Sequence, residues 1–252
     1  MMDLDEQART ILRRNDKGGY TLPTHGLYPY QWNWDSAFAA WGFATFDLPR
    51  AWAELTTLFS GQWDTGMVPH IIFHQTDPGY FPGPDVWDAG QVPPTSGISQ
   101  PPVAATMARL IFDTDPAASM DAVRALFPKM LAWHRWWMEN RCRDGAICIT
   151  HPWESGRDNC PDWDMAMANV DGSGVGEYTR RDTGHVDASM RPKKDEYDRY
   201  IAMVQVGRAC GWDQKEIVEN GPFLVADPGI TFILTRANDD LAALAQALDE
   251  DT

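Results

Sequence analysis

Apolar residues recur at helical spacing over much of the chain. Residues 3–13 place Leu4, Ala8, Ile11 and Leu12 on one face, which predicts an amphipathic helix. The same periodicity predicts further helices over residues 35–46, 50–61, 101–112, 119–141, 195–210 and 229–248. The alternation typical of strands is scarce. The pattern therefore predicts an all-α fold of roughly seven helices, paired as hairpins.

Turn-forming residues predict where these helices begin and break. Asp35 and Ser36 can cap the second helix, and Pro49 suits the first turn of the third. Pro128 predicts a kink or break inside the fifth helix, because proline lacks the backbone N–H that a helix interior needs. Residues 62–100 are rich in proline and glycine, which predicts a long ordered loop of the kind that commonly carries function.

The composition narrows the classes of partner and compartment. The chain has 252 residues, 44% of them hydrophobic, which is enough for a sizeable core. Its net charge of −15 repels nucleic acid and anionic lipid alike, so neither is an expected partner. There is no long apolar run and the N-terminal residues are acidic, so we expect a cytoplasmic protein. The four cysteines are expected to be free thiols, although Cys142 and Cys148 could pair in an exported chain.

One segment combines carboxylates with large apolar groups. HPWESGRDNCPDWD, residues 151–164, contains Trp153 and Trp163, which would add nothing to a solvated surface run. The segment therefore predicts the floor of a pocket. An aromatic face can stack on a sugar while carboxylates and amides bond its hydroxyls, so the 12 tryptophans favour a small carbohydrate ligand.

The tryptophans fall into two groups by context. Core packing is the favoured role of those in the 119–141 helix: Trp133, Trp136 and Trp137. Ligand contact is favoured for those at loop-to-helix junctions among polar residues: Trp32, Trp34 and Trp153.

Hydrolysis of a glycosidic bond needs one carboxylic acid and one carboxylate. Glu154 and Asp158 are four residues apart, but the Ser-Gly between them need not be helical, so the spacing does not establish a facing pair. Arg157 would oppose protonation of Asp158, whereas an apolar pocket would favour it. The sequence leaves both influences open.

Metal and nucleotide sites are the less favoured alternatives. His70 and His74 have a zinc-like spacing on a helix, but the apolar run between them is typical of a strand. Asp162 and Asp164 could hold calcium, but no loop with further oxygen ligands surrounds them. A phosphate-binding loop would follow an apolar strand, and no such strand precedes the glycines of residues 172–176. No metal or cofactor is therefore expected.

A basic cluster gathers in this acidic chain: Arg180, Arg181, Arg191, Lys193 and Lys194. A carboxylate-bearing substrate would need such charge, because arginine binds a carboxylate through a bidentate fork. Surface ion pairs with Asp182, Asp187 and Asp195 explain the cluster equally well.

Five motifs follow one another along the chain: YPYQWNWDSAF, GMVPHIIFHQ, SGISQPP, HPWESGRDNCPDWD and HVDASMRPKKDEYDRY. Together they resemble the mannosylglycerate hydrolase-like branch of glycoside hydrolase family 63. The resemblance extends over residues 25–248, and WESGRDN also resembles the ESG-x-D block of the trehalases. It implies an (α/α)6 barrel, a toroid of six helical hairpins in two concentric rings. It also implies hydrolysis that inverts the anomeric carbon without a cofactor.

The same resemblance assigns roles to individual residues. It implies that Asp158 is the general acid and that Asp35 holds the sugar in the subsite before the scissile bond. The other residues implied to line the pocket are Tyr30, Trp32, Trp34, His70, Gln100, Trp153, Gly156 and Arg157. Trp153 and Trp163 could supply the low-polarity surroundings that keep Asp158 protonated.

The chain departs from the family pattern in one respect. The family's general base is a glutamate near the C-terminal end of the domain, and the glutamates here do not lie in its motif: Glu154, Glu177, Glu196, Glu216 and Glu219. We therefore expect residues 1–252 to be the N-terminal portion of a single, incomplete (α/α)6 domain. An inverting α-glycosidase acting on mannosylglycerate or glucosylglycerate is the leading interpretation, and a non-catalytic sugar-binding protein is the alternative. An incomplete barrel would expose apolar residues of the last helix and favour a homo-oligomer: Ile230, Phe232, Ile233, Leu241 and Leu244.

Overall fold

The computed structural model describes residues 3–185, 187 and 191–249. The elements follow in the order α1 (Leu4–Asn15), β1 (Gln31–Trp32), α2 (Asn33–Ala44), α3 (Leu48–Ser60), β2 (Ile71–Ile72), α4 (Pro84–Trp87), α5 (Ala104–Thr114), α6 (Pro116–Arg141), β3 (Cys142–Arg143), β4 (Ala146–Ile149), η1 (Pro152–Ser155), η2 (Pro161–Trp163), α7 (Asp164–Met167), α8 (Asp182–His185), α9 (Lys194–Ala209), α10 (Gln214–Asn220), β5 (Val225–Ala226) and α11 (Pro228–Ala247).

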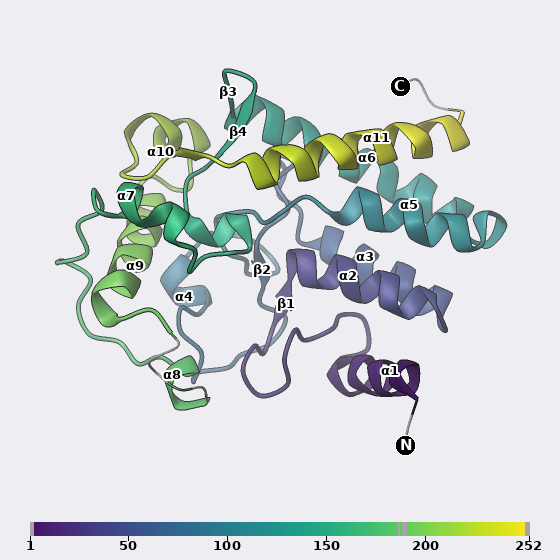
Figure 1. Cartoon of the computed structure of the whole chain (residues 1–252), viewed down its shortest axis with the longest axis horizontal. Helices are drawn as coiled ribbons and strands as arrows, with labels where there is room; N and C mark the ends of the chain where they lie inside the picture. The colour runs from purple at the N-terminus through teal and green to yellow at the C-terminus, as the bar shows by residue number, and fades with distance from the viewer. Residues whose placement is uncertain (1–2, 186, 188–190, 250–252) are drawn as a thin grey trace.

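Helices α2, α5 and α11 lie side by side, and each begins near the centre of the view in Figure 1. Helices α3 and α6 run back and pack against them. The space between these helices is filled by apolar side chains with almost no exposure, such as Phe43, Leu55, Ala108, Trp133 and Leu244. The predicted core of helical hairpins is thus confirmed, and short elements and loops gather at one end of it.

The capping residues follow the sequence in α3 and depart from it in α2. Asp47 accepts a hydrogen bond from the backbone N–H of Arg50, and Pro49 lies in the first turn of α3 as predicted. The prediction that Asp35 and Ser36 cap α2 was wrong, because the helix begins two residues earlier. The backbone N–H at its first residue, Asn33, donates to the carbonyl of His70.

Pro128 does not break α6, which continues from Pro116 to Arg141. Pro128 is exposed, so water can reach the carbonyl that loses its helical donor. Its neighbours Phe127 and Met130 are buried in the core and hold both sides of the helix in place.

Two small sheets, which the sequence analysis missed, brace the loop end. β1 pairs antiparallel with β2, with Trp32 opposite Ile71, so that the first two motifs of the sequence meet. β3, β4 and β5 form a second antiparallel sheet, and its central strand β4 ends just before residues 151–164. The predicted loop at residues 62–100 is present, but it contains β2 and α4.

The last helix is better packed than expected. Ile230, Leu241 and Leu244 are buried against the core that α5 and α6 share with α11, so the expectation that they lack partners was wrong. Phe232 differs, with 73% of its surface exposed. All four cysteines are free, in agreement with the sequence. No helix within the described ranges has the length and apolar character needed to cross a membrane.

Candidate active site

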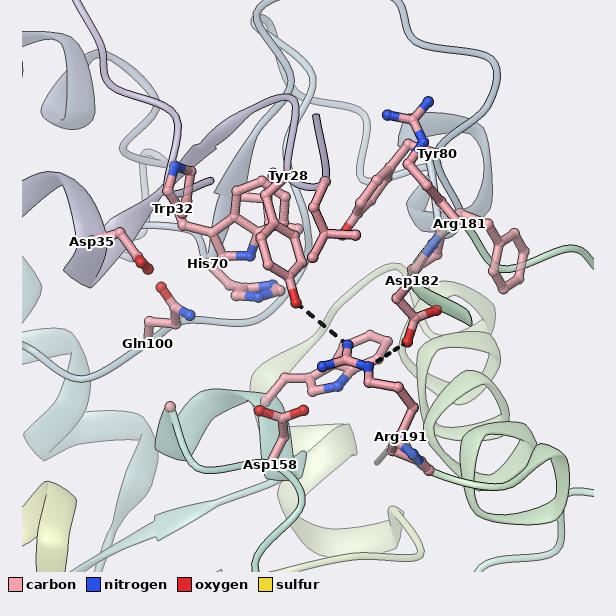
Figure 2. A pocket seen from close by; sticks show the side chains of 18 of the residues that line it. Tyr28, Trp32, Asp35, His70, Tyr80, Gln100, Asp158, Arg181, Asp182 and Arg191 are labelled. Carbon is pink, nitrogen blue, oxygen red and sulfur yellow. Dashed lines mark hydrogen bonds and ion pairs between the residues drawn. The ribbon is translucent and has the colours of Figure 1, made fainter. Parts of the chain in front are cut away.

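A cavity of about 220 Å³ lies at the loop end of the helices. Residues of five segments line it: 23–35, 70–82, Gln100, 153–158 and 181–197. This volume is somewhat below the roughly 300–1,000 Å³ of pockets for drug-sized ligands. The cavity therefore suits a small ligand, and Figure 2 shows Asp35, Gln100 and Asp158 around it.

The structure brings together eight of the ten predicted site residues. The cavity is lined by Trp32, Trp34, Asp35, His70, Gln100, Trp153, Gly156 and Asp158.

The other two predicted residues lie outside the lining, for identifiable reasons. Tyr30 is fully buried behind the cavity wall, and its hydroxyl donates to the carbonyl of Asp77. Arg157 donates instead to Asp162 and Asp227, and its guanidinium lies over the ring of Trp163.

Several lining residues were missed by the sequence analysis. They include Tyr28, Tyr80, Phe81, Asp182 and Tyr197. Tyr28 belongs to the same YPY stretch as Tyr30, so its motif was visible but its orientation was not. The remaining ones come from a loop, from the first residue of α8 and from α9, and no spacing pattern in the sequence predicts them.

Two of the three aspartates that line the cavity, Asp35 and Asp158, are harder to ionise than usual. Burial raises the pKa of Asp35 to about 6, although hydrogen bonds to its carboxylate partly oppose this effect. Burial also raises the pKa of Asp158, opposed by its own backbone N–H and by the positive charge of Arg191. Arg157 is directed at other carboxylates, so burial outweighs nearby positive charge at Asp158. A carboxyl with a raised pKa can retain the proton that a general acid must donate.

Trp153 forms a rigid wall of the cavity between two neutral histidines. Burial lowers the pKa of His70 and of His151 to about 3, so both rings are uncharged near neutral pH. His151 Nδ1 accepts a hydrogen bond from the backbone N–H of Trp153 at 3.0 Å, and its Nε2 lies 3.1 Å from the carbonyl of Tyr200. These partners require the tautomer with the proton on Nε2. The rings of His70 and Trp153 stack at 6.1 Å, which fixes the orientation of the indole.

Gly156, in the segment that carries Asp158, and Gln100, in the long loop, both contact Trp34 at the start of α2. Gly156 has a φ of +71°, and a Cβ there would lie 2.7 Å from the Trp34 ring, so a larger residue would displace the indole. Gln100 Oε1 accepts a hydrogen bond from the backbone N–H of Trp34 at 3.2 Å. Both contacts place Asp35, the next residue of α2, opposite Asp158 across the cavity (Figure 2).

The basic cluster is both ion-paired and partly in the cavity. Arg191 Nε donates to Asp182 at 2.7 Å, and its Nη2 donates to the Tyr28 hydroxyl at 3.4 Å (Figure 2). Arg181 pairs with Asp77 on the loop at the cavity rim. Arg181 and Arg191 line the cavity while making these pairs. The predicted ion pairing is confirmed for Asp182, and carboxylate binding by the cluster stays a prediction. Lys194 instead pairs with Asp198 one turn further along α9.

The residues considered for metal binding have other partners. His74 stacks on Tyr20 and bonds Gln31, whereas His70 lies in the cavity. Asp162 is paired with Arg157. Over residues 3–185, 187 and 191–249, no three His, Cys, Asp or Glu side chains are grouped so as to hold a metal ion.

A comparison with known protein families matches residues 28–252 to the mannosylglycerate hydrolase MGH1-like glycoside hydrolase domain. The chain belongs to this family. The matched range includes every segment that lines the cavity, apart from residues 23–27 at the start of the first segment.

Individual relatives agree with this family. The chain is 49% identical to mannosylglycerate hydrolase MGH1 of Selaginella moellendorffii, over 96% of this chain and 51% of that protein. It is 38% identical to glucosylglycerate hydrolase of Mycolicibacterium hassiacum, over 96% of this chain and 58% of that protein.

The fold matches solved structures of the same family. A crystal structure of GH63 mannosylglycerate hydrolase from Thermus thermophilus, in complex with Tris and D-glycerate, is 49% identical, with a TM-score of 0.95. The match covers 99% of this chain and 61% of that one. A second structure of that enzyme, in complex with glucose, has 47% identity and a TM-score of 0.88, over 99% and 61% of the two chains. The chain thus spans about half to three fifths of the length of these relatives.

Proposed function

We propose that the cavity binds mannosylglycerate or glucosylglycerate and contributes the general acid for hydrolysis with inversion at the anomeric carbon. The observation that carries this proposal is the position of Asp158, which faces a cavity with tryptophan walls and whose pKa is raised by burial. A carboxylic acid in that setting can protonate the leaving oxygen of a glycoside. The names of the relatives, mannosylglycerate and glucosylglycerate hydrolases, support the substrate class.

The two ends of the cavity suit the two parts of such a substrate. The ionised carboxylate of Asp35 and the amide of Gln100 can bond sugar hydroxyls, while Trp34 and Trp153 offer stacking faces. Arg191, beside the Tyr28 hydroxyl, can bind the glycerate carboxylate. The solved structures of one relative, in complex with glucose and in complex with Tris and D-glycerate, support a site for a sugar and a glycerate.

The general base is proposed to come from the part of the relatives' length that this chain does not span. In the described part of the chain, the carboxylates that line the cavity are all aspartates: Asp35, Asp158 and Asp182. Asp182 pairs with Arg180 and Arg191, and Asp35 is assigned to the sugar. The alternative function, sugar binding without hydrolysis, is therefore favoured by the same observation for this chain taken alone.

We also propose that residues 1–252 form the N-terminal portion of one (α/α)6 domain. The neighbouring helices α2, α5 and α11 would belong to the inner ring, and α3 and α6 to the outer ring. Phe38 and Trp41 of α2 and Phe232 of α11 are large, exposed apolar residues, as expected of inner helices that face further hairpins.

Proton NMR of the purified chain with α-mannosylglycerate tests the function. Early release of β-mannose would establish inverting hydrolysis. Asp158→Asn should then abolish release while sugar binding survives, and Asp162→Asn, an exposed carboxylate of the same segment, should change neither. Binding without release supports the alternative, and the absence of binding by a folded chain refutes both.

A further inference from the structure

Glu154, the other carboxylate near Asp158 in sequence, does not reach the cavity. Its side chain is fully buried. Its Oε1 accepts hydrogen bonds from the backbone N–H of Ser99 at 3.2 Å and from Arg141 Nη2 at 3.3 Å. Its Oε2 accepts hydrogen bonds from the backbone N–H and the hydroxyl of Thr150, at 2.8 and 3.1 Å. One carboxylate thus joins the long loop, the end of α6 and the end of β4 to the turn η1.

The partner on the long loop adjoins a residue of the cavity. Ser99 precedes Gln100, which bonds the backbone of Trp34. The hydroxyl of Ser99 donates to the carbonyl of Val68 at 2.7 Å and accepts from the indole N–H of Trp133 at 3.0 Å. Ser99 is therefore fixed from three directions, and Glu154 is fixed relative to it.

Arg141 completes this buried cluster. It is fully buried, and its Nη2 also donates to the Thr150 hydroxyl at 3.2 Å. A buried ion pair is a weak source of stability, because removing both charges from water offsets their attraction. Its best-attested use is to specify one arrangement among several. The placement of this pair between the core helices and the turn that leads to Asp158 therefore indicates a role in the geometry of the cavity.

We propose that Glu154, paired with Arg141, is a positioning residue that holds Asp158 facing the cavity. Glu154 lies in η1, and Asp158 follows that turn by three residues. An anchored turn therefore fixes the start of the short segment that carries Asp158. The inference deepens the proposed function and rests on it, because it concerns the geometry of the same site.

Isothermal titration calorimetry with α-mannosylglycerate tests the inference on the full chain. Glu154→Gln should weaken binding by about 10- to 100-fold, because the turn that Glu154 anchors also carries Trp153 of the cavity wall, and a displaced turn moves this binding residue together with Asp158. Leu244→Ala is the stability control, since Leu244 is buried in the core but does not line the cavity. It should lower the melting temperature and leave the affinity unchanged.

A second variant guards against loss of folding. Glu154→Gln alone leaves Arg141 buried without its ion-pair partner, whereas R141M/E154Q removes both charges, a change that is often neutral for stability. The double variant should fold and still bind weakly. Wild-type affinity in the folded double variant would overturn the inference.

A readout without ligand separates this inference from the proposed function. Carbon-13 NMR of the aspartate carboxyl carbons, assigned by comparison with Asp158→Asn, follows the titration of Asp158. In the wild type its pKa is raised by burial, and in both Glu154 variants it should move toward the usual aspartate value as the carboxyl gains water. If the wild type does not bind the glycoside, the proposed function fails, and this titration alone decides the inference. An unchanged Asp158 titration in the folded variants would refute it.

Discussion

Replacing Asp35 by asparagine should stabilise the protein at neutral pH and weaken ligand binding. Burial raises the pKa of Asp35 from 3.8 to about 6. At about 1.4 kcal/mol per pH unit, this displacement corresponds to about 3 kcal/mol. Partial contact with water reduces the expected effect to about 2 kcal/mol. A residue retained at such a cost to stability is expected to serve the ligand.

The sign of the effect defines the pH range of the experiment. Between pH 4 and 6 the folded protein binds more protons at Asp35 than the unfolded chain, so this residue lowers the free energy of unfolding as the pH rises. Asparagine does not ionise. The variant's advantage over the wild type should therefore be near zero below about pH 3, still be small at pH 4, and reach about 2 kcal/mol above pH 7.

Urea unfolding of both proteins at several pH values measures this difference. Histidines that titrate in the same range are present in both proteins and cancel in the comparison. Asp121→Asn, at an exposed position of α6, is the matched control and should leave the free energy of unfolding nearly unchanged. A gain for Asp35→Asn that is equal at pH 4 and pH 8, or no gain at pH 8, would refute the reasoning.

Three further substitutions test other parts of the site. Gly156→Ala forces a positive φ on alanine and a clash with Trp34, so the melting temperature should fall with a loss of about 1–3 kcal/mol; an unchanged value would contradict this. His151 is buried and neutral with a pKa of about 3, so the wild type loses stability as the pH falls from 6.5 toward 3. His151→Gln should flatten that decline in acid unfolding, and parallel curves would count against it. Arg191→Met should weaken mannosylglycerate binding by about tenfold or more and leave mannose binding nearly unchanged. Equal losses for both ligands in calorimetry would mean that Arg191 does not bind the carboxylate.

The helices were predictable because their apolar periodicity is local. The predicted ranges 195–210 and 229–248 agree with α9 and α11 to within a residue at each end. The start of α2 was not predictable in this way, since it depends on a hydrogen bond from Asn33 to His70. Local capping preference was overridden by strand pairing between distant segments.

The site residues likewise fall into those that a short segment predicts and those whose roles depend on distant residues. Trp153, Gly156 and Asp158 were visible as an unusual mixture of residue types in one short segment. The role of Arg157 was not, because one of its partners, Asp227, is 70 residues away and only the fold brings them together. The choice between burial and positive charge at Asp158 likewise needed three dimensions, because burial is not a property of a short segment.

The acidic excess of the chain has a kinetic consequence for an anionic substrate. The net charge of −15 would repel an anionic ligand within a Debye length of the surface, which is about 10 Å at 0.1 M salt. The ligand would meet this repulsion before it reaches Arg181 and Arg191 in the cavity. Raising the ionic strength should therefore speed association while weakening the arginine contacts that slow dissociation. The arginines would therefore slow the dissociation of the substrate and would not steer its approach. Association should be faster at physiological salt than in a dilute buffer.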